Sequence, residues 1–120
     1  MIKLIIAGKR DFNDYSLLKN QVDNFIQDYN LNVEEITIIS GGASGADALG
    51  EKYAKENNFP CEVFKADWNK YGKAAGPIRN ARMAAVATHA IVFWDGISKG
   101  SLSMINEAKF KKLNLRVIYI

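Results

Sequence analysis

Short apolar runs, rich in β-branched residues, alternate along the chain with longer segments that have the periodicity of an amphipathic helix. The apolar runs are residues 2–7, 36–39, 61–64, 90–94 and 116–120, and the helical segments are residues 15–29, 46–57, 78–87 and 101–113. A strand that is apolar almost throughout must be covered on both faces, which is typical of a parallel sheet flanked by helices. The alternation therefore predicts an α/β fold, a three-layer, Rossmann-like, doubly wound sheet of about five mainly parallel strands. We expect a single domain over residues 1–120.

Composition and charge narrow the class of protein further. The chain has 120 residues, of which 48% are hydrophobic and 24% charged, as in ordinary globular domains. No apolar run approaches membrane-spanning length and no signal-peptide pattern is seen, so we expect a cytoplasmic protein with no membrane partner. The single cysteine, Cys61, cannot form an internal disulfide, and we expect it to be a small core residue. The net charge of +3 is low for a dedicated duplex-DNA binder, but it suits an anionic small molecule or single-stranded nucleic acid.

Glycine-containing polar segments follow four of the five apolar runs. Because parallel strands all end at one edge of their sheet, we expect these segments to meet at that edge, which we call the carboxyl-end rim. The residues expected to contact a ligand there are Gly8, Lys9, Arg10, Gly41, Gly42, Ala43, Ser44, Gly45, Asp47, Trp68, Gly72, Lys73, Gly76, Arg79, Asn80, Asp95, Gly96, Ser98, Gly100 and Ser101. Four such segments at one edge favour a shared binding site over four unrelated turns.

Two of these segments have the chemistry of a phosphate site. Residues 41–45 precede a helix, whose free N–H groups and dipole attract an anion. Residues 72–80 combine two glycines with Lys73 and Arg79, and Pro77 suits the first turn of a helix. Neither segment has the Gly-Lys-Ser/Thr ending of a Walker loop or the glycine fingerprint of a nicotinamide dehydrogenase. We therefore expect a small-molecule ligand of nucleotide type and no resident cofactor.

Carboxylates and aromatic rings give the carboxyl-end rim further chemistry. Asp47 and Asp95 are the candidate catalytic residues, because either carboxylate can meet a ribose hydroxyl or act in chemistry on the sugar. Each also has a local alternative, at the helix dipole for Asp47 and in an Asp-Gly turn for Asp95. Trp68 is placed to stack on a base. The only histidine, His89, precedes a strand at the opposite end of the sheet, and we expect no metal site.

A set of motifs along nearly the whole chain resembles a known family. The matching residues are Gly8-x-Arg10-Asp11-Phe12, Gly41-Gly42-Ala43-x-Gly45-Ala46-Asp47, Ala66-Asp67-Trp68, Gly72-Lys73-x-Ala75-Gly76-Pro77-x-Arg79-Asn80-x-x-Met83 and Gly100-Ser101. Together they resemble the YspA-like (YAcAr) branch of the SLOG superfamily, Rossmann-like domains related to the LOG nucleotide phosphoribohydrolases and to the DNA-processing protein DprA. The resemblance implies a nucleotide-sized pocket at the carboxyl-end rim and a ligand of the NAD or ADP-ribose kind. By analogy, it also implies a homo-oligomer.

Three functions are compatible with these features. The first, which we favour, is a sensor or sequestering protein that binds a nucleotide-derived ligand in bacterial or phage signalling. The second is a nucleotide N-glycosidic hydrolase. The LOG loop Pro-Gly-Gly-x-Gly-Thr-x-x-Glu counts against it, since its glutamate falls at or near Leu49 in this chain. The third is single-stranded nucleic-acid binding through the basic rim, against which the modest charge counts.

Overall fold

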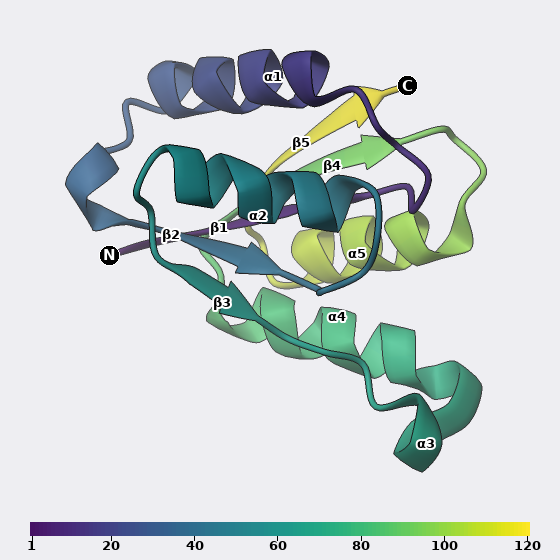
Figure 1. The fold of residues 1–120 in the computed structure, drawn as a ribbon. Helices are drawn as coiled ribbons and strands as arrows, with labels where there is room; N and C mark the ends of the chain where they lie inside the picture. Colours follow the sequence, from purple (N-terminus) through teal and green to yellow (C-terminus); the bar gives the residue numbers. More distant parts are fainter.

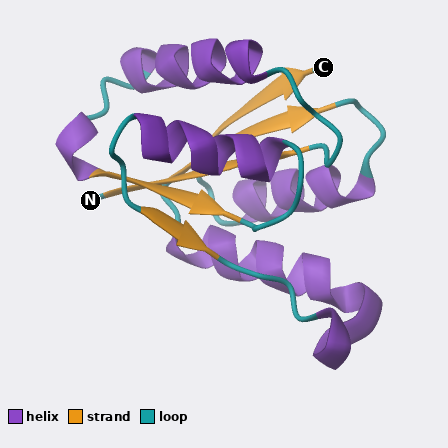
Figure 2. Ribbon diagram, viewed as in Figure 1, coloured by secondary structure: helices purple, strands orange, loops and turns teal.

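The computed structural model describes residues 1–120 and contains one five-stranded sheet in which every neighbouring pair of strands is parallel (Figures 1 and 2). The strands are β1 (Ile2–Gly8), β2 (Ile36–Ser40), β3 (Cys61–Val63), β4 (His89–Trp94) and β5 (Asn114–Tyr119). The α-helices are α1 (Tyr15–Asp28), α2 (Ala46–Glu56), α3 (Trp68–Tyr71), α4 (Ala75–Val86) and α5 (Lys99–Phe110), with single 3₁₀ turns at η1 (Val33–Glu35) and η2 (Gly72–Ala74). The structure confirms the predicted Rossmann-like α/β fold.

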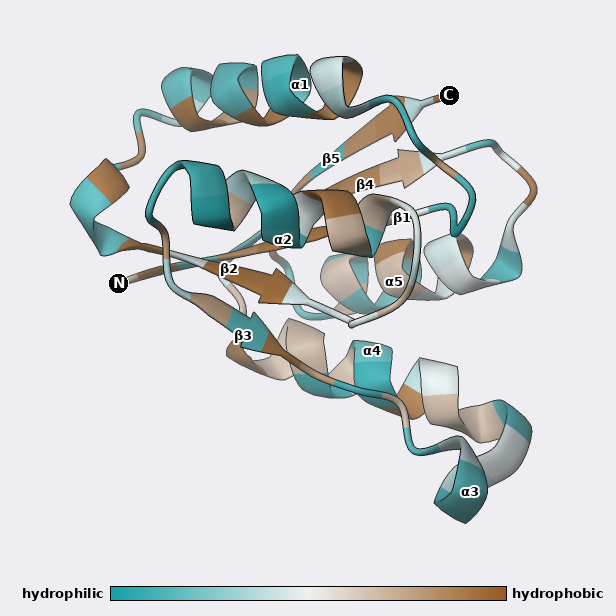
Figure 3. Cartoon of the chain, viewed as in Figure 1, coloured by the Kyte–Doolittle hydropathy of each residue, from teal (hydrophilic) through white to brown (hydrophobic).

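Alternate side chains of the strands supply two separate cores. On β1, Leu4 and Ile6 face α1 and α2, whereas Ile5 and Ala7 face α4 and α5, and all four are buried. Figure 2 shows α1 and α2 on one side of the strands and α4 and α5 on the other. The hydropathy colouring of α1 is polar outward and apolar toward the sheet (Figure 3). Burial on both faces is the reason that the strands read as continuous apolar runs.

The strand order places a crevice at the end of β1. The order is β3-β2-β1-β4-β5, so β1 pairs with β2 on one side and with β4 on the other. The chain leaves β1 toward one half of the sheet and later fills the other half, which makes β1/β4 the point where the order reverses. All arrowheads in Figure 1 point to the same end of the molecule, and this end is the carboxyl-end rim.

Three boundaries differ from those that the pattern predicts. Residues 68–74 are already helical, and α4 begins at Ala75, so Pro77 lies in its first turn. The last helix starts at Lys99, two residues before its apolar periodicity, and ends at Phe110. Strand β5 begins at Asn114 because backbone pairing with β4 extends to His89. In each case the hydrogen-bonded element begins before the apolar residues that carry the sequence signal.

The prediction that Cys61 is a core residue is wrong. Cys61 opens β3, an edge strand that pairs only with β2, and every residue of this strand is exposed. An apolar run at a sheet edge has the same sequence pattern as a central strand, so the pattern alone does not separate them. None of the helices in the structure has both the length and the apolar content that crossing a membrane requires.

Helix α2 packs so closely on β1 that it has room only for glycine at residue 50. A Cβ atom at Gly50 would come within 2.9 Å of the Cβ and Cγ2 atoms of Ile6. We expect Gly50→Ala to lower the free energy of unfolding by about 1–2 kcal/mol, because overpacking costs about 1–3 kcal/mol and helix propensity returns up to about 1 kcal/mol. Urea denaturation measures this difference.

The matched control is Gly100→Ala, in the first turn of α5, where nothing lies within 4 Å of an added Cβ. We expect this variant to unfold at an unchanged or slightly higher urea concentration. An equal loss of stability in both variants would contradict the packing argument.

Candidate functional site

A cavity of about 600 Å³ opens at the carboxyl-end rim, at the end of β1, and we call it the large lobe. Its lining residues are Ala7, Gly8, Lys9, Arg10, Asp11, Gly41, Ala43, Ser44, Asp47, Arg79, Asn80, Met83, Ser98, Gly100, Ser101 and Met104. A second hollow of about 350 Å³, the small lobe, adjoins it. The small lobe is lined by Arg10, Gly41, Gly42, Ala43, Ser44, Lys65, Ala66, Trp68 and Arg79. We call residues 41–45, between β2 and α2, the glycine loop. The two lobes share Arg10, Arg79 and three residues of this loop, Gly41, Ala43 and Ser44.

Backbone contacts between the ends of β1 and β2 hold this loop in place. The N–H group of Ala46, the first residue of α2, donates to the carbonyl oxygen of Lys9 at 3.1 Å. Gly45, just before it, has φ +75°, and a Cβ there would overlap the backbone of Lys9 and Arg10. The hydroxyl of Ser44 donates to the carbonyl oxygen of Arg10 at 3.0 Å. Only glycine fits this close crossing, so the two loops form one rigid wall.

Two charged side chains meet the loop beside Gly41. Arg79 donates from Nη1 to the carbonyl oxygen of Gly41 at 2.6 Å and from Nε to Oδ1 of Asn80 at 2.9 Å. Asp47 accepts the N–H group of Ala43 at 3.2 Å through Oδ2. A Cβ at Gly41 would lie 2.7 Å from Oδ2 of Asp47 and 2.9 Å from Nη1 of Arg79. The missing side chain of Gly41 therefore lets both charged groups reach the loop.

The environment of Asp47 disfavours its charge. The side chain is only 6% exposed, and this burial raises the pKa of Asp47 to about 6. The Ala43 N–H group and the Arg79 guanidinium oppose the rise in pKa, while Glu51 adds to it. Burial and the neighbouring positive charge of Arg10 lower the pKa of Arg79, which the carboxylate of Asp47 partly offsets. The site therefore holds a carboxyl group that titrates near neutral pH beside fixed guanidinium charge.

Glu51 stabilises the glycine loop through Ser40, a role that sequence reasoning did not predict. The hydroxyl of Ser40 donates to Oε2 of Glu51 at 2.6 Å and accepts the N–H group of Gly42 at 3.1 Å. Glu51 follows Asp47 by four residues, so both lie on one face of α2. That four-residue spacing is the only sequence signal for the role of Glu51. The residue lines neither lobe.

The start of α5 forms another wall of the large lobe. Ser98, Gly100 and Ser101 line it, and Ser101 is buried. Asn80 of α4 reaches this wall, since its Nδ2 donates to the hydroxyl of Ser103 at 3.2 Å. The first N–H groups of a helix have no partner within the helix. In α2 the N–H group of Ala46 is taken by Lys9, whereas the start of α5 lines this cavity through Gly100 and Ser101.

Asp95 lines neither lobe. Its Oδ1 accepts the N–H groups of Ser98 at 2.7 Å and Ile97 at 2.8 Å, and its Oδ2 accepts the Ser98 hydroxyl at 2.9 Å. These N–H donors, first that of Ser98, lower the pKa of Asp95 to about 2. The carboxylate thus shapes the turn before α5, with Lys9 at 3.7 Å.

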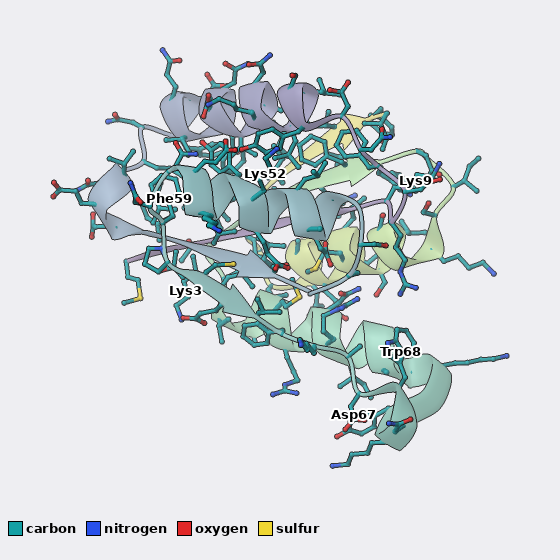
Figure 4. All side chains as sticks on the ribbon, in the orientation of Figure 1. Lys3, Lys9, Lys52, Phe59, Asp67 and Trp68 are labelled. Atoms are coloured by element: carbon teal, nitrogen blue, oxygen red, sulfur yellow. The ribbon has the colours of Figure 1, made fainter.

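Most of the sequence-predicted ligand residues come together in the two lobes. The large lobe gathers Gly8, Lys9, Arg10, Gly41, Ala43, Ser44, Asp47, Arg79, Asn80, Ser98, Gly100 and Ser101, and the small lobe adds Gly42 and Trp68. The residues that line neither lobe are Gly45, Gly72, Lys73, Gly76, Asp95 and Gly96. Figure 4 shows Lys9 and Trp68 on the same side of the molecule as this rim.

The lining residues that sequence reasoning did not select are mainly apolar, with the cation Lys65 and the carboxylate Asp11 as exceptions. Met83 and Met104 are buried helix residues whose spacing is that of ordinary core positions. Lys65 and Ala66 follow β3 and line the small lobe. No group of three or more His, Cys, Asp or Glu side chains comes together in the structure to hold a metal ion.

The chain is similar to a known protein family and to a phage protein. A model of the YspA, cpYpsA-related SLOG family matches residues 2–71. The Gene 61 protein of Mycobacterium phage D29 is 29% identical over 115 residues, which cover 91% of this chain and 90% of that protein.

Among solved structures, the X-ray structure of DNA processing protein A (DprA) from Streptococcus pneumoniae is similar, with a TM-score of 0.73 and 20% identity. The match covers 98% of this chain but 50% of that chain, so this chain spans half the length of DprA. At 20% identity this similarity shows a shared fold and nothing further.

We expect the stability of the protein to depend on the ionisation of Asp47. The pKa of this carboxyl is raised, so the neutral form stabilises the fold, and this stability is lost as the pH rises from about 4 through about 6. Asp47→Asn keeps an acceptor for the Ala43 N–H group and does not titrate. From pH 4 to pH 7, its free energy of unfolding should therefore rise relative to that of the natural protein by about 2 kcal/mol.

Urea denaturation of both proteins across this pH range makes the measurement. A difference between them that stays constant with pH would show that Asp47 titrates as it does in the unfolded chain, and would contradict the expected burial effect.

Proposed function

The chain belongs to the YspA, cpYpsA-related SLOG family, and from this premise we propose that it binds a nucleotide-derived ligand at the carboxyl-end rim. Membership supports a nucleotide-related or nucleic-acid-binding role in general. The observation that carries the finer proposal is the guanidinium of Arg79, held against Gly41 where the two lobes meet. We assign this group to the phosphate of the ligand.

The surroundings of Arg79 support a phosphate there. Helices α2 and α5 both start at the large lobe, and helix N-termini attract anions through free N–H groups and their dipoles. Arg79 is fixed by two hydrogen bonds, to Gly41 and Asn80, so it loses little freedom when it binds. Its remaining N–H donors are free to pair with phosphate oxygens in the two-pronged manner typical of arginine.

The polar side chains of the large lobe support a sugar as the neighbouring group. Asp47, Asn80 and Ser101 are all buried, yet all line the cavity. A carboxylate, an amide and a hydroxyl offer both acceptors and donors to ribose hydroxyls. A volume of about 600 Å³ lies in the range of small-molecule sites. We therefore propose a ligand of the NAD or ADP-ribose kind, which the protein senses or sequesters.

Replacement of the arginine tests this proposal. We expect Arg79→Ala to weaken binding of ADP-ribose by about 10-fold or more, since a charge-assisted hydrogen bond contributes about 1.5–3 kcal/mol. Isothermal titration calorimetry measures the affinity, and circular dichroism checks the fold. The matched control is Arg82→Ala, an exposed arginine of the same helix that lines neither lobe, which should bind as the natural protein does.

Absence of binding by AMP, NAD and ADP-ribose to the natural protein would overturn the proposal. Equal weakening by the two arginine substitutions would remove Arg79 from the site.

A second candidate function, cleavage of a nucleotide N-glycosidic bond, is favoured by one observation. Asp47 is a buried carboxyl in the large lobe with a pKa raised to about 6, which suits a general acid. In this reaction water attacks C1′ as the bond to the base breaks, Asp47 gives the base a proton, and the attacking water returns one. Release of free base from AMP or NAD by the natural protein but not by Asp47→Asn would support it. Equal release by both proteins would exclude Asp47 as the acid.

A further inference from the structure

Two arginines mark the boundary between the large and small lobes. Arg10 and Arg79 line both of them. The Ser44 hydroxyl holds the backbone of Arg10, whereas the side chain of Arg10 is exposed. Its positive charge contributes to the lowered pKa of Arg79, so the two guanidinium groups lie close enough to repel each other. A pair of like charges at one boundary is stabilised by an anion placed between them.

The protein itself supplies little negative charge at this boundary. Asp47 is the carboxyl group that acts on the charge of Arg79, and even when ionised it supplies one negative charge against the two guanidinium charges. Asp11 lines the large lobe, but its carboxylate pairs with Lys9 at 3.3 Å. The two guanidinium charges at this boundary therefore exceed the negative charge beside them, which favours an anionic ligand.

Trp68 gives the small lobe an aromatic surface. Its side chain is 49% exposed, which is unusual for tryptophan, and it lines the hollow. Its indole ring lies against the start of α4, since a Cβ at Gly76 would come within 3.4 Å of Cη2 of Trp68. The guanidinium of Arg10 lies over the ring at 5.6 Å from its centroid. Figure 4 shows Trp68 between α3 and α4 on this side of the molecule.

An exposed indole beside cations is the arrangement on which a nucleobase stacks. The cations that accompany Trp68 in the small lobe are Arg10, Arg79 and Lys65. The Arg10 guanidinium therefore lies beside the surface on which a base would stack.

We propose that the ligand spans both lobes, with a base on Trp68, a diphosphate between Arg10 and Arg79, and a second sugar in the large lobe. This inference rests on the proposed function, because both assign Arg79 to phosphate. The ligand class is a nucleoside diphosphate esterified to a further sugar, of which ADP-ribose is the simplest probe. A mononucleotide fills only part of this site, and a sugar phosphate without a base leaves Trp68 uncovered.

Three probes separate these parts of the site: ADP-ribose, AMP and ribose 5-phosphate. By calorimetry, we expect the natural protein to bind ADP-ribose about 10-fold or more tightly than either smaller probe. Trp68→Ala should weaken the binding of ADP-ribose about 10-fold, because base stacking is lost. It should change the affinity for ribose 5-phosphate by less than about twofold. Trp68→Phe should restore most of the affinity for ADP-ribose. Tyr71→Ala, a neighbouring exposed aromatic of α3 that lines neither lobe, is the control and should change nothing.

Two outcomes would overturn this inference while leaving the proposed function intact. One is ADP-ribose binding no more tightly than AMP, and the other is ADP-ribose affinity that Trp68→Ala does not change. A short oligothymidylate that binds more tightly than ADP-ribose and depends on Trp68 would overturn it in favour of nucleic acid. If none of the three probes binds, the inference and the proposed function both fail.

Discussion

The carboxyl-end rim depends on two charged side chains that share one glycine. Asp47 from α2 and Arg79 from α4 both reach Gly41, and each holds the loop through a hydrogen bond to its backbone. Neither charge is cancelled by a close ion pair, and burial works against both. A buried charge without full compensation is costly, and the phosphate that we propose would compensate the guanidinium of Arg79.

The doubly wound fold supplies the rigidity that such a site needs. The crossing of Gly45 over Lys9, the bond from Ala46 to Lys9 and the Glu51–Ser40 pair under Gly42 fix the loop before any ligand arrives. A preformed loop loses little entropy on binding. Helix α2 also packs closely on β1, where Gly50 contacts Ile6. This packing fixes the position of the helix, and so of its start at the cavity.

The fold and most of the residues that line the lobes could be predicted from the sequence, because both follow from simple rules. Apolar runs such as residues 36–39 require cover on both faces, and parallel strands must end together, which brings Gly41 and Ser101 to one cavity. The rest had two causes. Position in the sheet exposes Cys61 at an edge, which no local pattern shows. Asp95 takes the local turn role that its Asp-Gly sequence also allowed, and residues 72–74 form a helical turn that lines neither lobe.

The central claim is that a phosphate sits at Arg79, between the starts of α2 and α5. The most direct measurement is a titration of the ¹⁵N-labelled protein with ADP-ribose, followed by amide chemical shifts. The account predicts that the largest shifts fall on residues 41–47 and 98–101 and on the side-chain N–H of Arg79. Shifts confined to other surfaces, such as the exposed edge of β5, would contradict it.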